Sequence, residues 1–140
     1  MITKTGIHAV RAMVVLAGLP PGALAGAAKV AREIGAPQNY LGKLLQTLAR
    51  AGLVESQKGL GGGFRLARDP HEISLLDVVE PIEHINRWSG CILGRPECSD
   101  AAPCPLHNEW KKVRDAYMRM LRKTTLAELV RKGEASLLSI

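Results

Sequence analysis

The residues with the clearest potential for chemistry are the chain's three cysteines, which all lie in one short segment: Cys91, Cys98 and Cys104. His107 follows the last of them by three positions. An odd number of clustered thiols beside an imidazole does not form an ordinary set of disulfides, so this pattern predicts a metal or redox centre. Three thiolates with one nitrogen or oxygen ligand are a workable coordination set for an iron-sulfur cluster.

The spacing of the three cysteines favours a cluster over the other possible centres. It lacks the tight Cys-x-x-Cys pairs that are usual in structural zinc sites, although zinc and purely thiol-based redox sensing stay open as alternatives. Two histidines are candidates for the fourth ligand. His107 stands three positions after Cys104 at the start of a predicted helix, so both side chains could face one centre. His8 is the second candidate, reaching from the first helix of the same or a partner subunit.

The size of the chain and the distribution of its charge indicate what kind of partner it binds. A chain of 140 residues that is 46% hydrophobic can bury one core and carry an oligomerisation element. Residues 1–70 hold nine Lys and Arg against three Asp and Glu, whereas residues 71–140 hold ten of each, so the net charge of +6 belongs entirely to the first half. A positive field confined to one half indicates a polyanionic partner there, and nucleic acid is the commonest one.

Several function classes are disfavoured by what the sequence lacks. No stretch approaches the roughly 20 apolar residues that a membrane span requires, and we expect a cytoplasmic protein whose thiols stay reduced. No nucleophile and base, and no paired carboxylates, converge in the pattern, so we expect neither an enzyme nor a small-molecule substrate. Glu80 and Glu83 are interpreted as one exposed helix face.

Three helices are predicted over residues 5–19, 25–34 and 38–51. The last two are joined by the short turn Gly35-Ala36-Pro37, which predicts a helix-turn-helix whose second helix presents its polar face to the major groove of DNA. Near the start of that helix, four side chains are expected to read base edges: Gln38, Asn39, Tyr40 and Lys43.

A glycine-rich hairpin follows, with predicted strands at residues 53–57 and 64–67. Glycines in such number are costly in entropy unless the backbone turns sharply or approaches another molecule closely. We therefore interpret residues 58–63 as a wing whose tip reaches a minor groove and lies against phosphates. Phosphate contacts are expected from the wing and from the start of the chain, at Lys4, Thr5, Lys58, Gly59, Gly61, Gly62 and Arg65.

The second half is predicted to hold two longer helices separated by the cysteine segment. A capping box, Ser74-x-x-Asp77, predicts a helix over residues 75–83. Residues 86–104 have no periodicity, and a bound metal would account for so long a loop. A helix is then expected from Pro105, as its first residue, to about Lys123, followed by a short segment over residues 126–131.

One apolar stripe along the helix from Pro105 is longer than a single small domain needs. We expect it to pair with the same helix of a second copy, because twofold dimers match palindromic operators in double-stranded DNA; packing back onto its own domain is the alternative. The predicted fold is mainly α with a small β-hairpin wing. It comprises a winged helix-turn-helix domain over residues 1–83, a cysteine-rich cluster-binding loop over 84–104, and a dimerisation helix and C-terminal tail over 105–140.

These residues together resemble the iron-sulfur cluster regulator family of winged-helix transcription factors, the group of the IscR, NsrR and RirA types, over about residues 1–135. The most specific parts are the three cysteines ahead of the long helix, Tyr40-Leu41 at the start of the reading helix, and the segments 48–54 (LARAGLV) and 59–67 (GLGGGFRLA). The resemblance implies a homodimeric regulator, expected to be a repressor, with one cluster per subunit whose loss, oxidation or nitrosylation changes the affinity for DNA.

The resemblance also implies the ligands of the cluster. Cys91, Cys98 and Cys104 would bind iron, and the ending Cys104-Pro105-Leu106-His107 is similar to the IscR type, in which a histidine completes a 2Fe-2S site. His8 stands where NsrR types carry an aspartate for a 4Fe-4S cluster, so 2Fe-2S is favoured and 4Fe-4S is the alternative. Two other functions stay open: a zinc-stabilised or thiol-switched winged-helix regulator without a cluster, and a small iron-sulfur carrier.

Overall fold

The structure, a computed structural model, describes residues 2–85 and 90–138. Part of the predicted cysteine-rich loop, residues 86–89, therefore lies outside the described residues, as do the first residue and the last two. The fold is mainly helical with one two-stranded antiparallel hairpin, as predicted. Its elements in chain order are α1 (Lys4–Ala17), α2 (Ala27–Ile34), α3 (Gln38–Arg50), β1 (Val54–Gln57), β2 (Gly63–Leu66), η1 (Pro70–Glu72), α4 (Leu75–Glu83), α5 (His107–Lys123) and α6 (Leu126–Leu138).

Helix α1 lies at the centre of the core, because it is apolar around most of its circumference. It packs against α2, α3, α4, α6 and the hairpin. Met13 and Val14 are fully buried within it, and Thr3 caps its first turn by accepting a hydrogen bond from the Gly6 amide. Burial of each such side chain stabilises the fold by about 1.5–3 kcal/mol, so α1 is the element to which the others are fixed.

The helix-turn-helix forms as predicted, with one difference at its start. Leucines at the spacing of one helix face, Leu41, Leu44, Leu45 and Leu48, are all buried in α3. Helix α2 was expected from Ala25 but begins at Ala27, because Ala25 instead pairs with Phe64 of β2 through two backbone hydrogen bonds of 2.8 and 2.9 Å. This bridge adds a short third edge to the hairpin and ties the wing to the helix-turn-helix.

Helix α4 has the predicted capping box and also fastens the start of α1. The Ser74 and Asp77 side chains each accept the other's backbone amide at 3.0 Å. At the far end of α4, the Glu83 carboxylate accepts hydrogen bonds from the amide and the hydroxyl of Thr3, where a negative charge is favourable to the start of α1. The interpretation of Glu80 and Glu83 as an exposed face is therefore wrong, since both are partly buried and Glu83 joins α4 to α1.

The last two helices differ from the predicted ones at their ends. Helix α5 begins at His107, because Pro105 lies in a turn that the His107 amide closes on the Cys104 carbonyl at 3.0 Å. Helix α6 continues well past residue 131, to Leu138. The predicted single stripe of α5 divides into two faces: Tyr117 packs against the core and Leu121 is buried in it.

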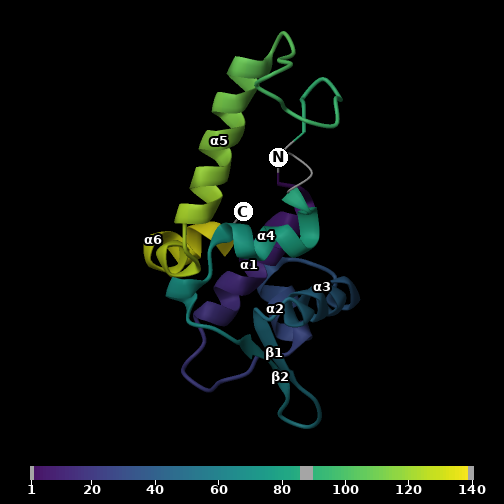
Figure 1. The fold of residues 1–140 in the computed structure, drawn as a ribbon. Helices are drawn as coiled ribbons and strands as arrows, with labels where there is room; N and C mark the ends of the chain where they lie inside the picture. The colour runs from purple at the N-terminus through teal and green to yellow at the C-terminus, as the bar shows by residue number, and fades with distance from the viewer. Residues whose placement is uncertain (1, 86–89, 139–140) are drawn as a thin grey trace.

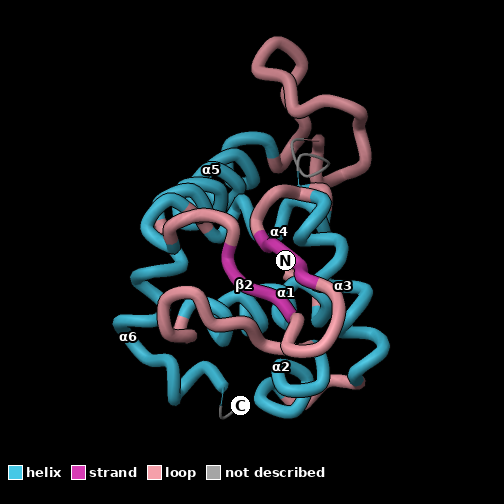
Figure 2. Tube along the Cα trace, turned by 90° about the horizontal axis from the view of Figure 1, so that it is seen from below, coloured by secondary structure: helices cyan, strands magenta, loops and turns pink. Residues whose placement is uncertain are grey.

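The overall shape separates two regions. Figure 1 shows the hairpin projecting from one end of the helical body, while α5 rises from the opposite side and carries the cysteine-rich loop at its far end. The view from below in Figure 2 confirms that the strands lie on the near side of the helices and that the cysteine-rich loop projects away from them. No helix among the described residues has the length and apolar character needed to cross a membrane.

Candidate nucleic-acid interface and cysteine centre

A groove of about 750 Å³ runs along the outer face of α3. Three of the four predicted base-reading side chains, Gln38, Asn39 and Lys43, line it and are exposed. The groove continues along α3 past the residues that were singled out, and its further polar lining comes from Gln46, Thr47 and Arg50. Their spacing on the outward face of α3 was the available signal for them. A concave polar strip of this kind presents donors and acceptors that can meet base edges.

Tyr40, the fourth predicted base reader, is directed differently. Its hydroxyl lies 3.1 Å from Nδ1 of His8, and the two rings form an edge contact with centroids 5.5 Å apart. His8 is only 8% exposed, and burial, with smaller contributions from the charges of Lys4 and Arg11, lowers its pKa. The pair joins the second turn of α1 to the first turn of α3, and Lys4 and Thr5 lie within about one turn of His8 on α1.

The wing glycines have reasons within the fold. Gly62 packs so closely on the hairpin that a Cβ there would lie 2.1 Å from the Gln57 carbonyl oxygen, and one on Gly63 would lie 2.7 Å from the Ala25 backbone. The glycines were expected either for a sharp turn or for a close approach to another molecule. Within the described residues, they are explained by the turn and by close packing inside the fold. The wing tip also presents the exposed side chains of Lys58 and Leu60.

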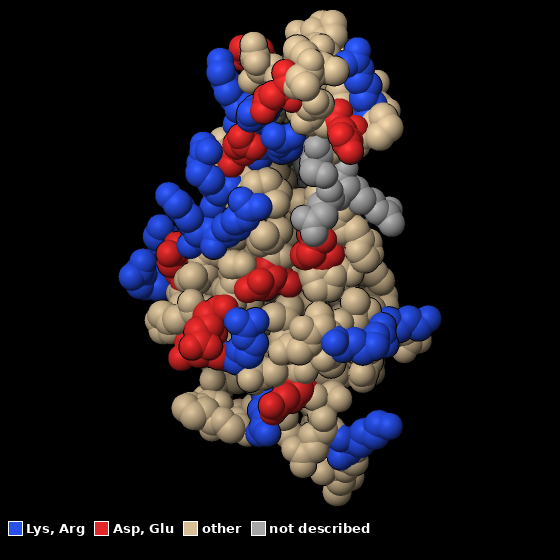
Figure 3. All heavy atoms as spheres, in the orientation of Figure 1, with Lys and Arg blue, Asp and Glu red and all other residues tan. Residues whose placement is uncertain are grey.

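Arg65, predicted to contact phosphate, has an acidic partner across the hairpin. Its Nε donates to Oε2 of Glu55 at 2.9 Å, and the two residues are directly paired in the strand register. Both side chains are about half exposed, so the pair is weak and the remaining guanidinium donors are available. Positive charge also gathers away from the reader, which consists of α1, α2, α3 and the hairpin: α5 carries six Lys and Arg against two acids, and Figure 3 shows basic side chains along its outer side.

The cysteine-rich loop is ordered by polar contacts rather than by an apolar core. A tight turn closes between Cys91 and Gly94, whose amide donates to the Cys91 carbonyl at 2.9 Å. The Arg95 guanidinium donates to the Ala102 carbonyl at 2.8 Å, and the Trp110 indole donates to the Gly90 carbonyl at 3.1 Å. These contacts connect the two ends of the loop with each other and with α5.

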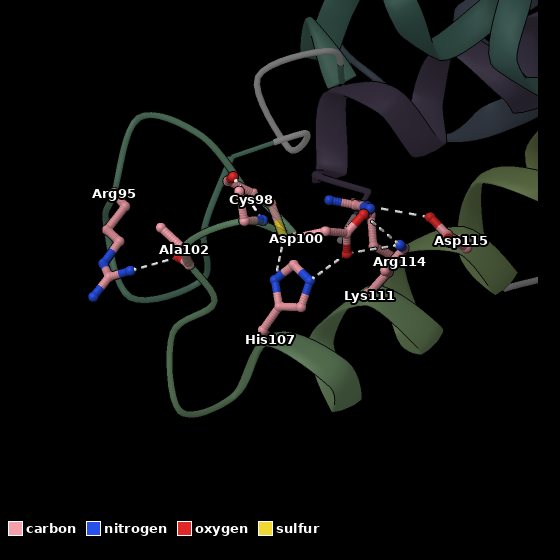
Figure 4. A network of polar contacts seen from close by, with 10 residues as sticks. Arg95, Cys98, Asp100, Ala102, His107, Lys111, Arg114 and Asp115 are labelled. Carbon is pink, nitrogen blue, oxygen red and sulfur yellow. Dashed lines mark hydrogen bonds and ion pairs between the residues drawn. The ribbon is translucent and has the colours of Figure 1, made fainter.

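His107 stands between a thiol and a carboxylate. Its Nδ1 lies 3.3 Å from Sγ of Cys98, and its Nε2 lies 2.7 Å from Oδ1 of Asp100. Lys111, one turn along α5, donates to both carboxylate oxygens of Asp100 at 3.0 and 3.1 Å. Figure 4 shows the imidazole ring held between these groups. The hydrogen bond from His107, and after it Lys111, lowers the pKa of Asp100, which therefore stays charged at neutral pH.

The other two cysteines form a second pairing. The Leu93 amide donates to Sγ of Cys91 at 3.4 Å and is the main cause that lowers the pKa of Cys91, with a smaller contribution from the Cys104 side chain. All three cysteines are free thiols, and Cys104 is buried. Within the described ranges, no three His, Cys, Asp or Glu side chains are placed to hold a single metal ion. The potential ligands are instead grouped two and two, with Cys91 beside Cys104 and Cys98 beside His107.

Sequence reasoning did not identify Asp100 or Lys111 as parts of this site. Asp100 lies in an aperiodic loop, so its distance from His107 along the chain says nothing about their separation in space. Lys111 follows His107 by four positions on α5, and that helical spacing is the one signal that could have indicated it. His8, the second candidate ligand, contacts Tyr40, whereas His107 is the histidine that the described contacts bring to a cysteine of the same chain.

Comparison with known proteins gives a consistent result. The chain is 30% identical to the transcriptional regulator NsrR of Bacillus subtilis over 134 residues, which cover 95% of this chain and 92% of the relative. Among solved structures, CymR, the global cysteine regulator of B. subtilis, matches with a TM-score of 0.77 at 27% identity over 94% of this chain and 96% of that one. The IscR of T. potens matches with a TM-score of 0.77 at 26% identity, over 97% of this chain and 90% of that one.

The family profile that matches residues 2–132 is that of Rrf2, described as an iron-dependent transcriptional regulator. The relatives and structural neighbours named above are likewise regulators and not enzymes. The helix-turn-helix and the wing thus belong to one known architecture, and the chain is a DNA-binding transcriptional regulator of the Rrf2 family.

Proposed function

We propose that this regulator is a homodimer whose affinity for its operator is controlled by an iron-sulfur cluster bound to Cys91, Cys98, Cys104 and His107, and that it acts as a repressor. The observation that carries the proposal is the arrangement at His107. Its Nδ1 lies 3.3 Å from Cys98 while a charged carboxylate holds its other ring nitrogen. Histidines that bind metals commonly donate their second ring N–H to such an acceptor.

The donor set fits an iron-sulfur cluster. Three free thiols supply the soft ligands that these clusters use, and the lowered pKa of Cys91 favours its thiolate, which is the form that binds iron. A 2Fe-2S cluster takes two protein ligands at each iron, and the side chains are grouped as two pairs. This grouping supports 2Fe-2S over a single zinc ion, for which all four ligands would have to meet around one point. When bound, the cluster would supply a redox-active, labile centre.

The exposed face of α5 supports dimerisation. Val113 and Met120 are 56% and 48% exposed on α5, and Leu106, 45% exposed, lies directly before its first residue. The three are seven residues apart, so they continue one apolar stripe that their own domain leaves uncovered. A repeat of seven is typical of helices that pair side by side. A second copy that covers this stripe would place two reading helices in one assembly, as a palindromic operator in double-stranded DNA requires.

DNA recognition is assigned to two groups of residues. Base readout would come from Gln38, Asn39 and Lys43 in the α3 groove, since these side chains are exposed along one concave strip. Phosphate contacts would come from Lys4, Thr5, Lys58, Arg65 and the wing amides at Gly59, Gly61 and Gly62, which would make the affinity sensitive to salt.

Two side-chain contacts lie between the cysteine-rich loop and the reading helix. Glu83, at the end of α4 just before the loop, binds Thr3 at the start of α1, and His8 of α1 contacts Tyr40 of α3. Ordering of the loop by a cluster would therefore affect α1, which positions α3 through the contact between His8 and Tyr40. In such a scheme cluster and DNA bias the same geometry, so each changes the affinity for the other.

A thiol switch without a cluster is the second candidate, favoured by the contact between Cys91 and Cys104. Hydrogen peroxide would oxidise one thiol to a sulfenic acid with release of water, and condensation with the other thiol would then form a disulfide and a second water. The solved relative described as a global cysteine regulator makes this candidate worth a direct test.

The deciding experiment is an anaerobic purification with iron and sulfide quantification and an absorption spectrum, repeated on Cys98→Ser, His107→Ala and His8→Ala. We expect coloured wild-type protein with iron and sulfide, a lost or altered spectrum in the first two variants, and an unchanged spectrum in His8→Ala. Colourless wild-type protein that binds DNA with salt-sensitive affinity, and forms a disulfide with peroxide, would favour the thiol switch. Wild-type protein with a cluster but no DNA binding would instead favour a small iron-sulfur carrier.

A further inference from the structure

We infer that Asp100 is a positioning residue for the proposed centre: it holds His107 in the tautomer that carries the proton on Nε2, so that Nδ1 is the nitrogen offered to iron. This inference rests on the proposed function for its metal and on the described contacts for its geometry. A neutral imidazole has one N–H and one lone pair, so the partner of one nitrogen decides the role of the other.

For the neutral ring, the contacts around His107 assign these roles. A carboxylate only accepts hydrogen bonds, so Nε2, at 2.7 Å from Oδ1 of Asp100, must be the donor. Nδ1 is then left with its lone pair directed toward Sγ of Cys98 at 3.3 Å. The opposite tautomer would place two lone pairs against each other at the Asp100 contact and an N–H against the sulfur that has to bind iron.

Asp100 is itself held in place. Lys111 donates to both of its oxygens, and His107 and Lys111 lie one turn apart on α5, so the carboxylate is fixed between two side chains of the same helix. Asp100 is 74% exposed on the loop, whereas His107 is 5% exposed. An exposed ion pair contributes little to folding, so the geometry of this carboxylate matters chiefly for the buried ring that it contacts.

The chemical consequence concerns the ring and not the fold. With Nε2–H committed to Asp100, the imidazole cannot rotate or exchange tautomers without breaking a charge-assisted hydrogen bond. The ligating nitrogen is therefore set before iron arrives. Loss of comparable outer partners of metal-binding histidines typically costs 10- to 100-fold in metal affinity.

The first part of the test needs no metal. Histidine labelled with ¹⁵N would be incorporated into reduced, cluster-free protein, and long-range ¹H–¹⁵N correlation spectra would be recorded at alkaline pH. We expect the Nε2–H tautomer for His107 in the wild type and in Asp115→Ala, a matched loss of an ion-paired aspartate on α5. Asp100→Ala should show a mixture of the two tautomers. Asp100→Asn keeps an oxygen acceptor without the charge, so it should show a smaller population of the Nδ1–H tautomer than Asp100→Ala.

The second part uses iron and sulfide as the probe. After anaerobic reconstitution, the rate at which a chelator removes iron should rise at least about tenfold in Asp100→Ala and stay unchanged in Asp115→Ala. Pulsed EPR on the reduced cluster with Nδ1-labelled histidine should show that the labelled nitrogen is the coordinating one. Coordination through Nε2 would overturn the inference.

Three further outcomes are distinguishable. The Nδ1–H tautomer in the wild type, or an Nε2–H tautomer that survives in Asp100→Ala, would overturn the role of Asp100 whether or not iron binds. Wild-type protein that takes up neither iron nor sulfide would instead refute the proposed function. The tautomer measurement would in that case still decide whether Asp100 sets the ring.

Discussion

The reader and the cysteine-rich loop are held together by different forces. In the reader, Met13, Leu41, Leu45 and Leu48 are completely buried, and the helices and hairpin pack around α1. In the loop, Ile92 and Leu93 are more than half exposed, and order comes from backbone turns and from the polar contacts of Arg95, Asp100 and His107. Apolar burial thus stabilises the part that would bind DNA, while the part that would sense the signal depends on groups that a ligand can rearrange.

The sharpest test of this difference is to truncate one leucine in each region. Leu45→Ala removes a fully buried side chain from α3 and should lower the free energy of unfolding by about 2–5 kcal/mol. Leu93→Ala removes a side chain that is 57% exposed in the loop and should change it by no more than about 0.5 kcal/mol. Urea denaturation followed by far-ultraviolet circular dichroism measures both. Equal losses would mean that the loop is part of the core.

The contact between α1 and the end of α4, just before the loop, should have a smaller effect. Glu83→Gln removes the charge that binds the amide and hydroxyl of Thr3 at the start of α1, and we expect a loss of about 1 kcal/mol in the free energy of unfolding. Glu97→Gln, an exposed change within the loop, is the matched control. For both variants, the affinity for DNA should also be measured with and without the cluster. If the ratio of these two affinities in Glu83→Gln equalled the wild-type ratio, α4 would not transmit the signal.

Protonation of His8 should make the stability of the reader sensitive to pH. Burial lowers the pKa of His8 below its ordinary value of 6.5, so the unfolded chain binds this proton more tightly than the folded one. The associated stability is fully present above pH 6.5 and is lost as the pH falls through 6.5 toward the folded-state pKa. In cluster-free protein, His8→Gln should show a shallower fall in the free energy of unfolding between neutral and mildly acidic pH. An identical fall in both proteins would show that other groups cause it.

The smallest expected effect lies at the wing, where Glu55 neutralises Arg65. Glu55→Gln frees the guanidinium and should raise the affinity for DNA, with a log–log salt slope steeper by about 1 for each phosphate that it then contacts. Glu33→Gln, which removes an exposed acid from α2, serves as the control for the change in net charge alone. If the affinity for DNA rose equally in both variants, the cause would be the change in net charge, and Arg65 would have no specific role.

The sequence predicted those elements whose signals are local. The leucine spacing of α3 and the capping box of α4 depend on residues a few positions apart, and both appear as expected. The pairing of Ala25 with Phe64 was missed because it joins positions far apart in the chain. For α5, periodicity identified apolar positions, but only the packing shows that Leu121 faces the core and Val113 faces outward.

The candidate ligands could be chosen from the sequence, but their arrangement in space could not. Residue types alone indicated the cysteines and His107, because thiols and imidazoles are few. Which of them lie together depends on an aperiodic loop, so neither the two pairings nor the role of Asp100 could be read from the spacing. Tyr40 shows the same limit, since a residue at the start of a helix can face either DNA or the neighbouring helix, and here its hydroxyl contacts His8.

The most direct test of cluster control is a comparison of operator affinity with and without the cluster. DNA selected from a randomised pool by cluster-loaded protein would be titrated, at one salt concentration and without oxygen, with loaded protein and with the same protein after chelation of its iron. We predict dissociation constants that differ by about 5- to 150-fold, the range expected for coupled sites. Equal constants for a wild-type protein that demonstrably held and lost its iron would contradict control of DNA binding by the cysteine centre.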